Sequence, residues 1–254
     1  MSNAQTNANP LGHERIGKLL TRYAVPSIIS LIINSLYNMV DQIFIGQGVG
    51  FLGNGATNII APIATIAIAV STLFGDGLAA FFSLNLGRGE PEKAAKGVGN
   101  AVVSGAVISL LYTVIAIIFL KPLCILFGAT ENILPYALGY GRIIVIGFPF
   151  VIVGTVINSS IRTDGSPRYA MFSMMIGAIL NTILDPIFIF VLQWGVEGAA
   201  TATVISQLVG MLCNIAYLFR FKTIRLQKSS FAFSGRIMGR LASLGFASCF
   251  NNLT

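Results

Sequence analysis

The sequence predicts an all-α integral membrane protein, built as a six-helix transmembrane bundle. Hydrophobic residues make up 55% of the 254 residues and charged residues only 10%, which leaves too little polar surface for an ordinary soluble domain. The mean hydropathy of +0.81 points the same way. Apolar stretches of about 20 residues or more, each long enough to cross a bilayer as a helix, recur between short polar loops.

Basic residues and short loops delimit these stretches in chain order. The first stretch follows a basic N-terminal segment, and the third and fifth follow residues 87–93 and 162–168. Both loops carry glycine, proline and charge, as turns between helices usually do. The predicted helices are residues 21–45, 57–86, 94–120, 143–161, 169–192 and 199–219.

All but two of the 16 Lys and Arg residues fall on one side of these helices, the exceptions being Lys121 and Arg142. By the positive-inside rule, the N-terminus and the loop after the sixth helix are expected in the cytoplasm of a multi-pass cell-membrane protein. The net charge of +7 is then explained by topology, and no nucleic-acid partner is expected. The basic residues of this side are Arg15, Lys18, Arg22, Arg88, Lys93, Lys96, Arg162, Arg168, Arg220, Lys222, Arg225, Lys228, Arg236 and Arg240.

The domain organisation suggests one lobe followed by the beginning of another. We expect residues 1–220 to form the N-terminal six-helix lobe, 221–236 a basic cytoplasmic linker, and 237–254 the start of a seventh helix. The segment from Arg236 to Ser248 can be laid over that from Arg15 to Ser27 at a constant offset, although the identities are few. Parallel repeats of this kind are common in transporters, so a C-terminal lobe of the same protein is an expected partner.

Three carboxylates, Asp41, Asp76 and Asp185, interrupt stretches that are otherwise apolar. A charged side chain at the bilayer centre costs roughly 3 kcal/mol on insertion scales, so it normally lines a cavity or relays an ion. Asp76 lies between two glycines, and it fits a cavity role and a structural role equally well. The glycines beside it permit a close helix approach or a bend.

The first helix carries a polar stripe that ends in Asp41. Its members recur at spacings of three and four, which places them on one helix face. Hydrogen bonding between helices is an alternative explanation, mainly for the first two members. The stripe consists of Ser30, Asn34, Tyr37, Asn38 and Asp41.

Two later helices add oxygen atoms that a hard cation would favour. Asn181 and Asp185 share a helix face, and Pro186 cannot donate to the carbonyl of Thr182. Thr203 and Gln207 belong to a polar stripe on the sixth helix. Because two neighbouring carboxylates cannot both stay charged cheaply, a proton or Na⁺ is expected to bind there. Thr203 bonding back to its own helix is the alternative for that residue.

Other residue types argue against catalysis. The three cysteines are scattered without metal-ligand spacing, and His13, the only histidine, precedes the first span. No serine has a nearby basic partner in the pattern of a nucleophile, so we expect no enzyme and no cofactor beyond a coupling ion. Pro26 and Pro186 are candidate hinges, and Pro149 is a further bend point.

Several short segments occur in an order and spacing that resemble the multidrug and toxin extrusion (MATE) transporters. The similarity runs through essentially the whole chain. The segments are Ala24-Val25-Pro26-Ser27, Val40-Asp41, Leu86-Gly87-Arg88-Gly89-Glu90, Glu92-Lys93-Ala94, Ile161-Arg162-Thr163-Asp164-Gly165, Asn181 with Asp185-Pro186, and the run from Gly195 to Thr203.

The resemblance implies twelve helices in two lobes around a drug cavity, and export of small organic cations in exchange for H⁺ or Na⁺. In the branch that this chain resembles most, the cation site falls on Asp41, Asn181, Asp185 and Thr203, which would also be the ligands of a coupling Na⁺. Asn34, Tyr37, Asn38, Gln207 and Asp76 are the candidate cavity-lining residues. The Gly-Asp-Gly segment at Asp76 is not a family feature, and Ala247 stands where the second lobe's proline is expected.

A lipid-linked saccharide flippase of the same superfamily is the main alternative. Its cavity would be expected to carry Arg and Lys for pyrophosphate, whereas no basic residue stands at mid-span here. A channel or a receptor is also compatible with the composition, but the Gly- and Pro-rich spans favour alternating access. Membrane lipid is an expected partner in every case.

Overall fold

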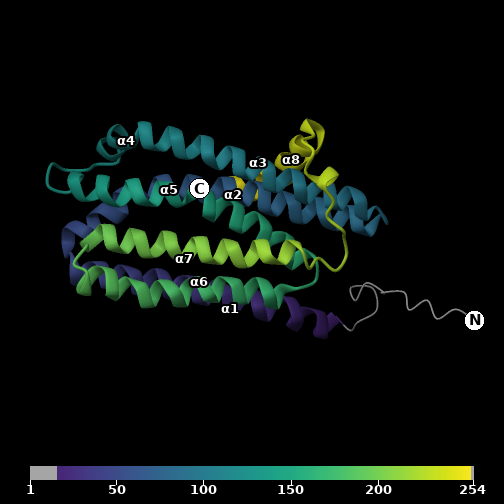
Figure 1. The fold of residues 1–254 in the computed structure, drawn as a ribbon, viewed down its shortest axis with the longest axis horizontal. Coiled ribbons are helices and arrows are strands. Elements are labelled where there is room, and N and C mark those ends of the chain that lie inside the picture. Colours follow the sequence, from purple (N-terminus) through teal and green to yellow (C-terminus); the bar gives the residue numbers. More distant parts are fainter. Residues whose placement is uncertain (1–15, 253–254) are drawn as a thin grey trace, which may run out of the picture.

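A computed structural model describes residues 16–252, except for the side chains of residues 16, 18, 19, 22 and 23. The predictions that involve His13, Arg15, the side chains of Lys18 and Arg22, and the last two residues lie outside this part. Within it, the fold consists of helices and the non-helical segments that connect them, and six of the helices are long and apolar enough to span a membrane. The long helices run alongside one another (Figure 1). They are α1 (Ile16–Gly48), α2 (Phe51–Gly87), α3 (Pro91–Ile118), α5 (Leu134–Thr163), α6 (Pro167–Pro186) and α7 (Gly195–Leu218).

The predicted all-α bundle with six spans is confirmed, but several boundaries differ. α2 begins at Phe51 and α5 at Leu134, both earlier than predicted, because helices continue beyond the apolar stretch that marks the membrane core. The predicted third span is divided near Phe119, after which the short α4 (Leu120–Leu126) begins. The predicted fifth span is α6 followed by a π-helical turn, η2 (Ile187–Val191).

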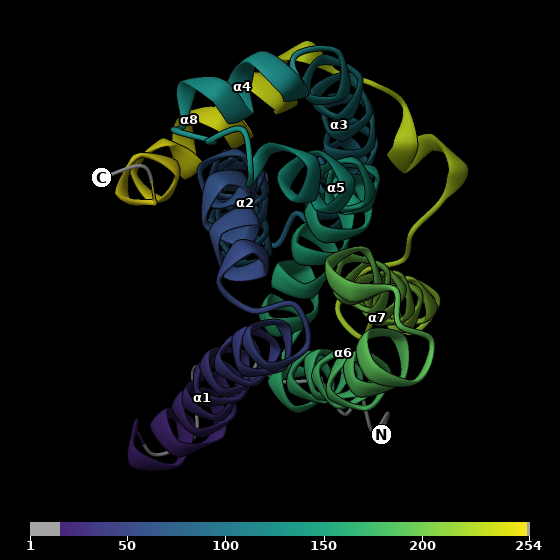
Figure 2. The ribbon, with the colours of Figure 1, turned by 90° about the vertical axis from the view of Figure 1, so that its left-hand side faces the viewer.

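α5 is the central helix of the bundle. It packs against α2, α3 and α7, and Figure 2 shows it between α2 on one side and α7 on the other. Ile152, Val156 and Ile157 on this helix are fully buried. Burying such branched side chains stabilises the packing of the neighbouring helices by about 1.5–3 kcal/mol each in water, and less where lipid is the alternative.

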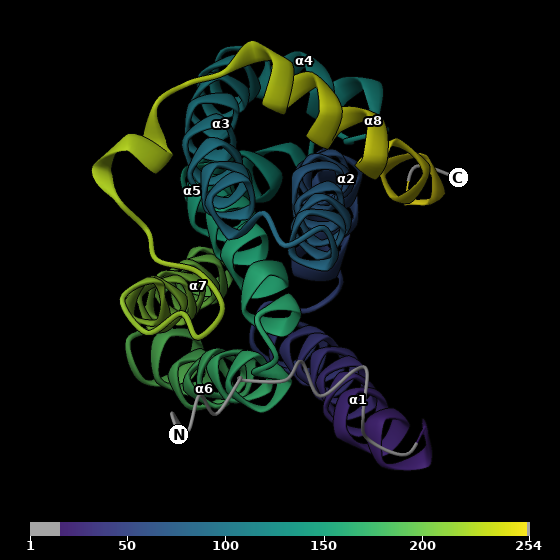
Figure 3. The same cartoon turned by 90° about the vertical axis from the view of Figure 1, so that its right-hand side faces the viewer.

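α1 lies at the edge of the bundle and packs mainly against α6. The start of α1 extends away from the other helices (Figure 3). Several of its large apolar residues are exposed, including Leu31 at 68% and Met39 at 62%, which suits a helix that faces lipid. The hinge candidate Pro26 lies inside α1, and Pro186 is the last residue of α6.

A polar network joins α5, α6 and α7. Asn158 Nδ2 donates to Ala170 O (3.0 Å) and Ser173 Oγ (3.2 Å). Ser173 Oγ donates to Asn214 Oδ1 (2.7 Å), and Asn214 Nδ2 donates to Gly154 O (3.1 Å). Inside a membrane such bonds hold helices together because lipid offers no competing partner.

The segment after α7 is fastened to the bundle at both ends. The buried Asp164 carboxylate accepts hydrogen bonds from the Tyr217 hydroxyl (2.7 Å), from Thr223 Oγ1 (2.6 Å), and from the backbone amides of Lys222 and Thr223 (both 2.9 Å). Farther along, Asn100 donates to Ala232 O (3.0 Å) and accepts from Ser234 N (2.7 Å). The short 3₁₀ turn η3 (Lys228–Phe231) lies between these two attachments, against α3.

The last helix, α8 (Gly235–Asn251), crosses α2, and the two are in extensive contact (Figure 3). Gly77 of α2 faces the backbone of Leu241, and Gly245 of α8 faces the backbone of Leu73. A Cβ atom at either glycine would collide with the opposing backbone. Glycine at both positions is therefore what allows the two helices to approach so closely.

Candidate cation site

The antiparallel order of the helices brings four of the predicted residues together. Asp41 lies two turns before the end of α1, Asp185 lies at the end of α6, and Thr203 lies two turns into α7. All three positions are therefore toward the end of the bundle away from the basic loops. Asp41 is 6% exposed, Asp185 is fully buried, and Asn181 and Thr203 are also buried.

Asn181 connects α6 to α7. Its Nδ2 donates to Asp185 Oδ1 (3.1 Å) and to Thr203 Oγ1 (3.2 Å). Both bonds use the amide nitrogen of Asn181. No described donor makes a hydrogen bond to its carbonyl oxygen, which is buried.

Asp41 adds the second carboxyl group from α1. It lies within hydrogen-bonding reach of the Asp185 carboxyl, and Gln42 Nε2 donates to its Oδ2 (3.4 Å). Gln42 is itself held by Thr57 Oγ1, which donates to Gln42 Oε1 (3.0 Å). Two carboxylates are both acceptors, so a contact between them requires a shared proton or a bound cation.

Three buried oxygen atoms of this cluster receive no hydrogen bond of good geometry from any described residue. They are Asp41 Oδ1, Asp185 Oδ2 and Asn181 Oδ1. Buried polar atoms are normally paired, and an unpaired group calls for an explanation. Carboxylate, amide and hydroxyl oxygens are the ligands that hard cations prefer, so the cluster can hold either a proton or an alkali-metal cation.

A cavity of about 260 Å³ opens beside the cluster. Among the predicted residues, Tyr37, Asn38 and Gln207 line it, together with Asp41 and Thr203. No Lys or Arg is among the described residues that form its wall. The other polar or aromatic lining residues are Gln42, Thr57, Asn58, Tyr140 and Phe148.

Two of the predicted lining residues lie elsewhere. Asn34 is exposed, and it accepts from Asn38 Nδ2 at both its backbone oxygen (2.7 Å) and its Oδ1 (3.0 Å). Asp76 is also exposed on α2, between Gly75, which faces Ser159, and Gly77, which faces α8.

The remaining member of the α1 stripe has a local role. Ser30 Oγ donates to the backbone oxygen of Pro26 (2.8 Å), one turn earlier. This is a hydroxyl that bonds back to the carbonyl four residues earlier in its own helix. Ser30 thus bonds within its own helix, rather than to the neighbouring helix that the alternative explanation would require.

Sequence reasoning did not find Gln42, Thr57 or Tyr140. Gln42 follows Asn38 by four residues and adjoins Asp41, so the stripe itself offered a usable signal for it. Tyr140 precedes the predicted fourth span, because Gly139, Gly141 and Arg142 interrupt the apolar pattern there.

A scan against protein-family models matches residues 26–187 to the MatE family. The chain belongs to the MatE family. The match covers the spans that carry Asp41, Asn181 and Asp185, whereas Thr203 lies beyond it. Within this family the chain corresponds to the N-terminal lobe.

Among curated proteins, this MatE chain is 28% identical over 207 residues to the multidrug export protein MepA of Staphylococcus saprophyticus. That alignment covers 80% of the chain and 45% of the relative. The MatE chain thus spans about half the length of the curated relatives it matches.

Solved structures give the same relationship. A crystal structure of MATE in complex with MaD3S superimposes with a TM-score of 0.90 at 26% identity, covering 98% of this chain and 56% of the other. A MOP-superfamily transporter from Pyrococcus furiosus gives a TM-score of 0.89 at 26% identity, covering 98% and 55%. For that second transporter, a reverse polarity of the binding pocket suggests a different function.

Proposed function

We propose that this chain is the N-terminal lobe of a cation-coupled antiporter that exports amphipathic or cationic compounds. Asp41, Asn181, Asp185 and Thr203 bind the coupling ion, H⁺ or Na⁺. The observation that carries the proposal is the pair of buried carboxyl groups from two different helices, each with one oxygen atom that no described residue satisfies as a donor.

Such a site couples an ion gradient to transport because its occupancy changes the charge between α1 and α6. When the ion leaves, two carboxylates face each other in a buried site and repel. α1 is the helix able to respond, since it packs largely against α6 alone. One charge moved through 100 mV supplies about 2.3 kcal/mol, enough for a roughly fifty-fold substrate gradient.

The cavity beside the cluster supports a cationic or amphipathic substrate. Its wall combines Asp41 with aromatic and apolar side chains, among them Tyr37, Tyr140 and Phe148. Aromatic faces and a carboxylate attract organic cations. The relatives named as multidrug export proteins agree with this substrate class, and the second lobe would complete the cavity.

In this proposal the basic end of the bundle lies in the cytoplasm, with the N-terminus. The loops at this end carry most of the Lys and Arg residues, so the positive-inside rule supports this orientation. The ion cluster then lies in the outer half of the membrane, where an ion from outside reaches it.

Efflux of a fluorescent organic cation from vesicles tests the proposal. The full-length protein that carries this chain is compared with Asp41→Asn under separately imposed H⁺ and Na⁺ gradients. We expect one gradient to drive efflux by the unmodified protein and the substitution to abolish that dependence, because an amide is neutral and can no longer bind a proton.

Asp76→Asn is the matched control, since it makes the same chemical change at an acid outside the cluster and should keep ion-driven efflux. Equal efflux by the unmodified protein and Asp41→Asn would place the coupling site elsewhere. Movement of a lipid-linked saccharide without dye efflux would favour the flippase alternative.

A further inference from the structure

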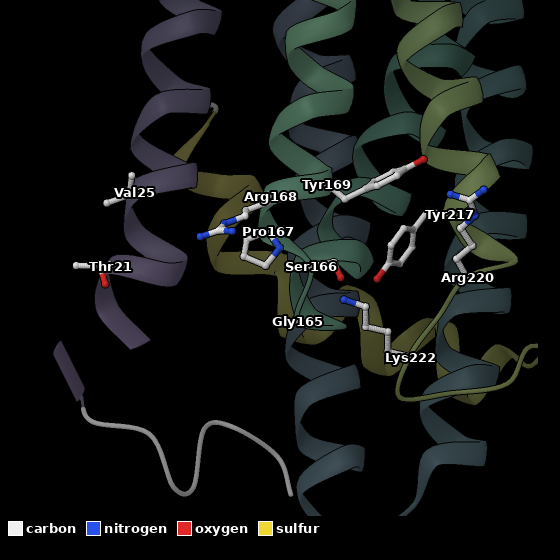
Figure 4. A pocket seen from close by; sticks show the side chains of 10 residues that line it. All are labelled: Thr21, Val25, Gly165, Ser166, Pro167, Arg168, Tyr169, Tyr217, Arg220 and Lys222. Atoms are coloured by element: carbon white, nitrogen blue, oxygen red, sulfur yellow. The ribbon is translucent and has the colours of Figure 1, made fainter. Parts of the chain in front are cut away.

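A second, larger cavity lies at the basic end of the bundle, far from the ion cluster. Its volume is about 860 Å³, and it lies between the start of α1, the start of α6 and the end of α7. Figure 4 shows the side chains that line it. They are Thr21, Val25, Gly165, Ser166, Pro167, Arg168, Tyr169, Tyr217, Arg220 and Lys222.

The lining is strongly one-sided in charge. Arg168, Arg220 and Lys222 are exposed there, and no carboxylate is among the lining residues that belong to the described part of the chain. In the described part of the chain, none of the three side chains forms an ion pair or a hydrogen bond. Asp164, which directly precedes the lining residue Gly165, already accepts four hydrogen bonds from Tyr217, Lys222 and Thr223.

Further groups in the cavity favour an anion. α6 begins there at Pro167, so the positive end of its helix dipole points into the space. The Ser166 hydroxyl is buried (8% exposed) beside Tyr217 and makes no hydrogen bond of good geometry. Figure 4 shows the Lys222 ammonium group directed toward Ser166, with Arg168 on the α1 side and Arg220 on the α7 side.

We propose that this cavity binds the phosphate headgroup of an anionic membrane phospholipid. In Figure 4 the three cationic groups lie at separate places along the cavity and do not converge on one point, which suits a headgroup with its phosphate and glycerol oxygens. Val25, half exposed, adjoins the cavity on α1, and Phe172, 55% exposed, follows one turn into α6. An acyl chain could therefore continue along the apolar surface while the phosphate stays among the cations.

The site would also attach α1, the helix proposed above to respond to the coupling ion, to the membrane surface. α1 contributes Thr21 and Val25 to the cavity, whereas α6 and α7 contribute the cations. A bound lipid would therefore bridge α1 to its neighbours at the end opposite the ion cluster.

Native mass spectrometry of the full-length protein with phosphatidylglycerol or phosphatidylcholine tests this inference. We expect phosphatidylglycerol to be retained preferentially, and the triple variant Arg168→Gln, Arg220→Gln, Lys222→Gln to bind it on the order of a hundredfold more weakly, since each basic residue near the surface contributes about 1 kcal/mol. The matched control is Arg88→Gln, Lys96→Gln, Lys228→Gln, which removes the same charge from exposed positions outside the cavity.

Two results would overturn the proposal. One is an equal loss of phosphatidylglycerol binding in the two triple variants, which would mean that the lipid binds through general surface charge and not in this cavity. The other is that inorganic phosphate stabilises the protein in neutral-lipid nanodiscs as much as phosphatidylglycerol does, and that only the cavity variant loses this stabilisation. That result would mean a site for free phosphate. Both readouts are independent of ion-driven efflux, so failure of the proposed transport function would leave the lipid result standing.

Discussion

Asn181 is the residue on which the geometry of the ion cluster depends. Its amide nitrogen holds Asp185 and Thr203 in fixed positions, and its own oxygen is left without a donor. One side chain thus orients an acid and offers a further ligand. If the cluster binds the coupling ion as proposed, we expect a substitution of Asn181 to affect ion affinity more than folding.

We predict that Asn181→Ala weakens the apparent affinity for the coupling ion by about tenfold to a hundredfold. The reason is the loss of one hydrogen bond to a carboxyl group, worth about 1.5–3 kcal/mol, together with one oxygen ligand. The ion concentration that gives half-maximal efflux measures the effect. Asn34→Ala is the control, because that exposed residue lies outside the cavity. An unchanged half-maximal concentration in Asn181→Ala would remove this residue from the site.

The sequence predicted which residues of the cluster share a helix face, but not every neighbour across helices. The spacing of Asn181 and Asp185 requires them to meet if α6 is helical. The contact of Gln42 with Asp41 and Thr57 depends on how α1 and α2 cross. The residue spacing within one helix cannot predict that crossing. Asn34 fits the stripe equally well, yet it is exposed, because α1 has so few neighbours on that side.

At the scale of elements, Asp164 links two helices to the segment that follows them. It stands directly after α5, and its carboxylate receives donors from α7 and from the two residues after the turn. The basic segment predicted as a linker is consequently fastened to the lobe at its beginning, by a residue from a loop that is distant in sequence.

We predict that Asp164→Ala lowers the stability of the protein by about 3 kcal/mol or more. The substitution leaves several donors without their acceptor, and each hydrogen bond to a charged group is worth about 1.5–3 kcal/mol. Thermal unfolding in detergent measures the loss. Glu131→Gln, at an exposed acid, should leave the midpoint unchanged. A midpoint for Asp164→Ala equal to that of the unmodified protein would show that the attachment contributes nothing.

At the scale of the whole molecule, hydropathy was enough to predict the class of fold and the six spans. It could not predict the arrangement, because lipid-facing and buried apolar residues look alike in such helices. The central position of α5 follows from close packing on three sides. Similarly, the two glycines of the α2–α8 crossing are visible in the sequence, but only the fold shows that they face each other's backbone.

That crossing joins the six-helix bundle to α8, which we interpret as the first helix of the second lobe. Gly77 and Gly245 form its closest point, and each faces backbone atoms that cannot move aside as a flexible side chain would. The two lobes of an alternating-access transporter must stay in contact while they rock. A contact between backbones without intervening side chains suits a pivot.

We predict that Gly77→Ala and Gly245→Ala each separate the two helices, lower the unfolding midpoint by several degrees and reduce efflux, since overpacking costs about 1–3 kcal/mol even where side chains can adjust. Gly239→Ala is the matched control on α8, because a Cβ there meets open space and alanine favours a helix by roughly 1 kcal/mol. Its midpoint should stay the same or rise. If all three variants unfold and transport alike, the crossing tolerates a methyl group and is not the point about which the lobes turn.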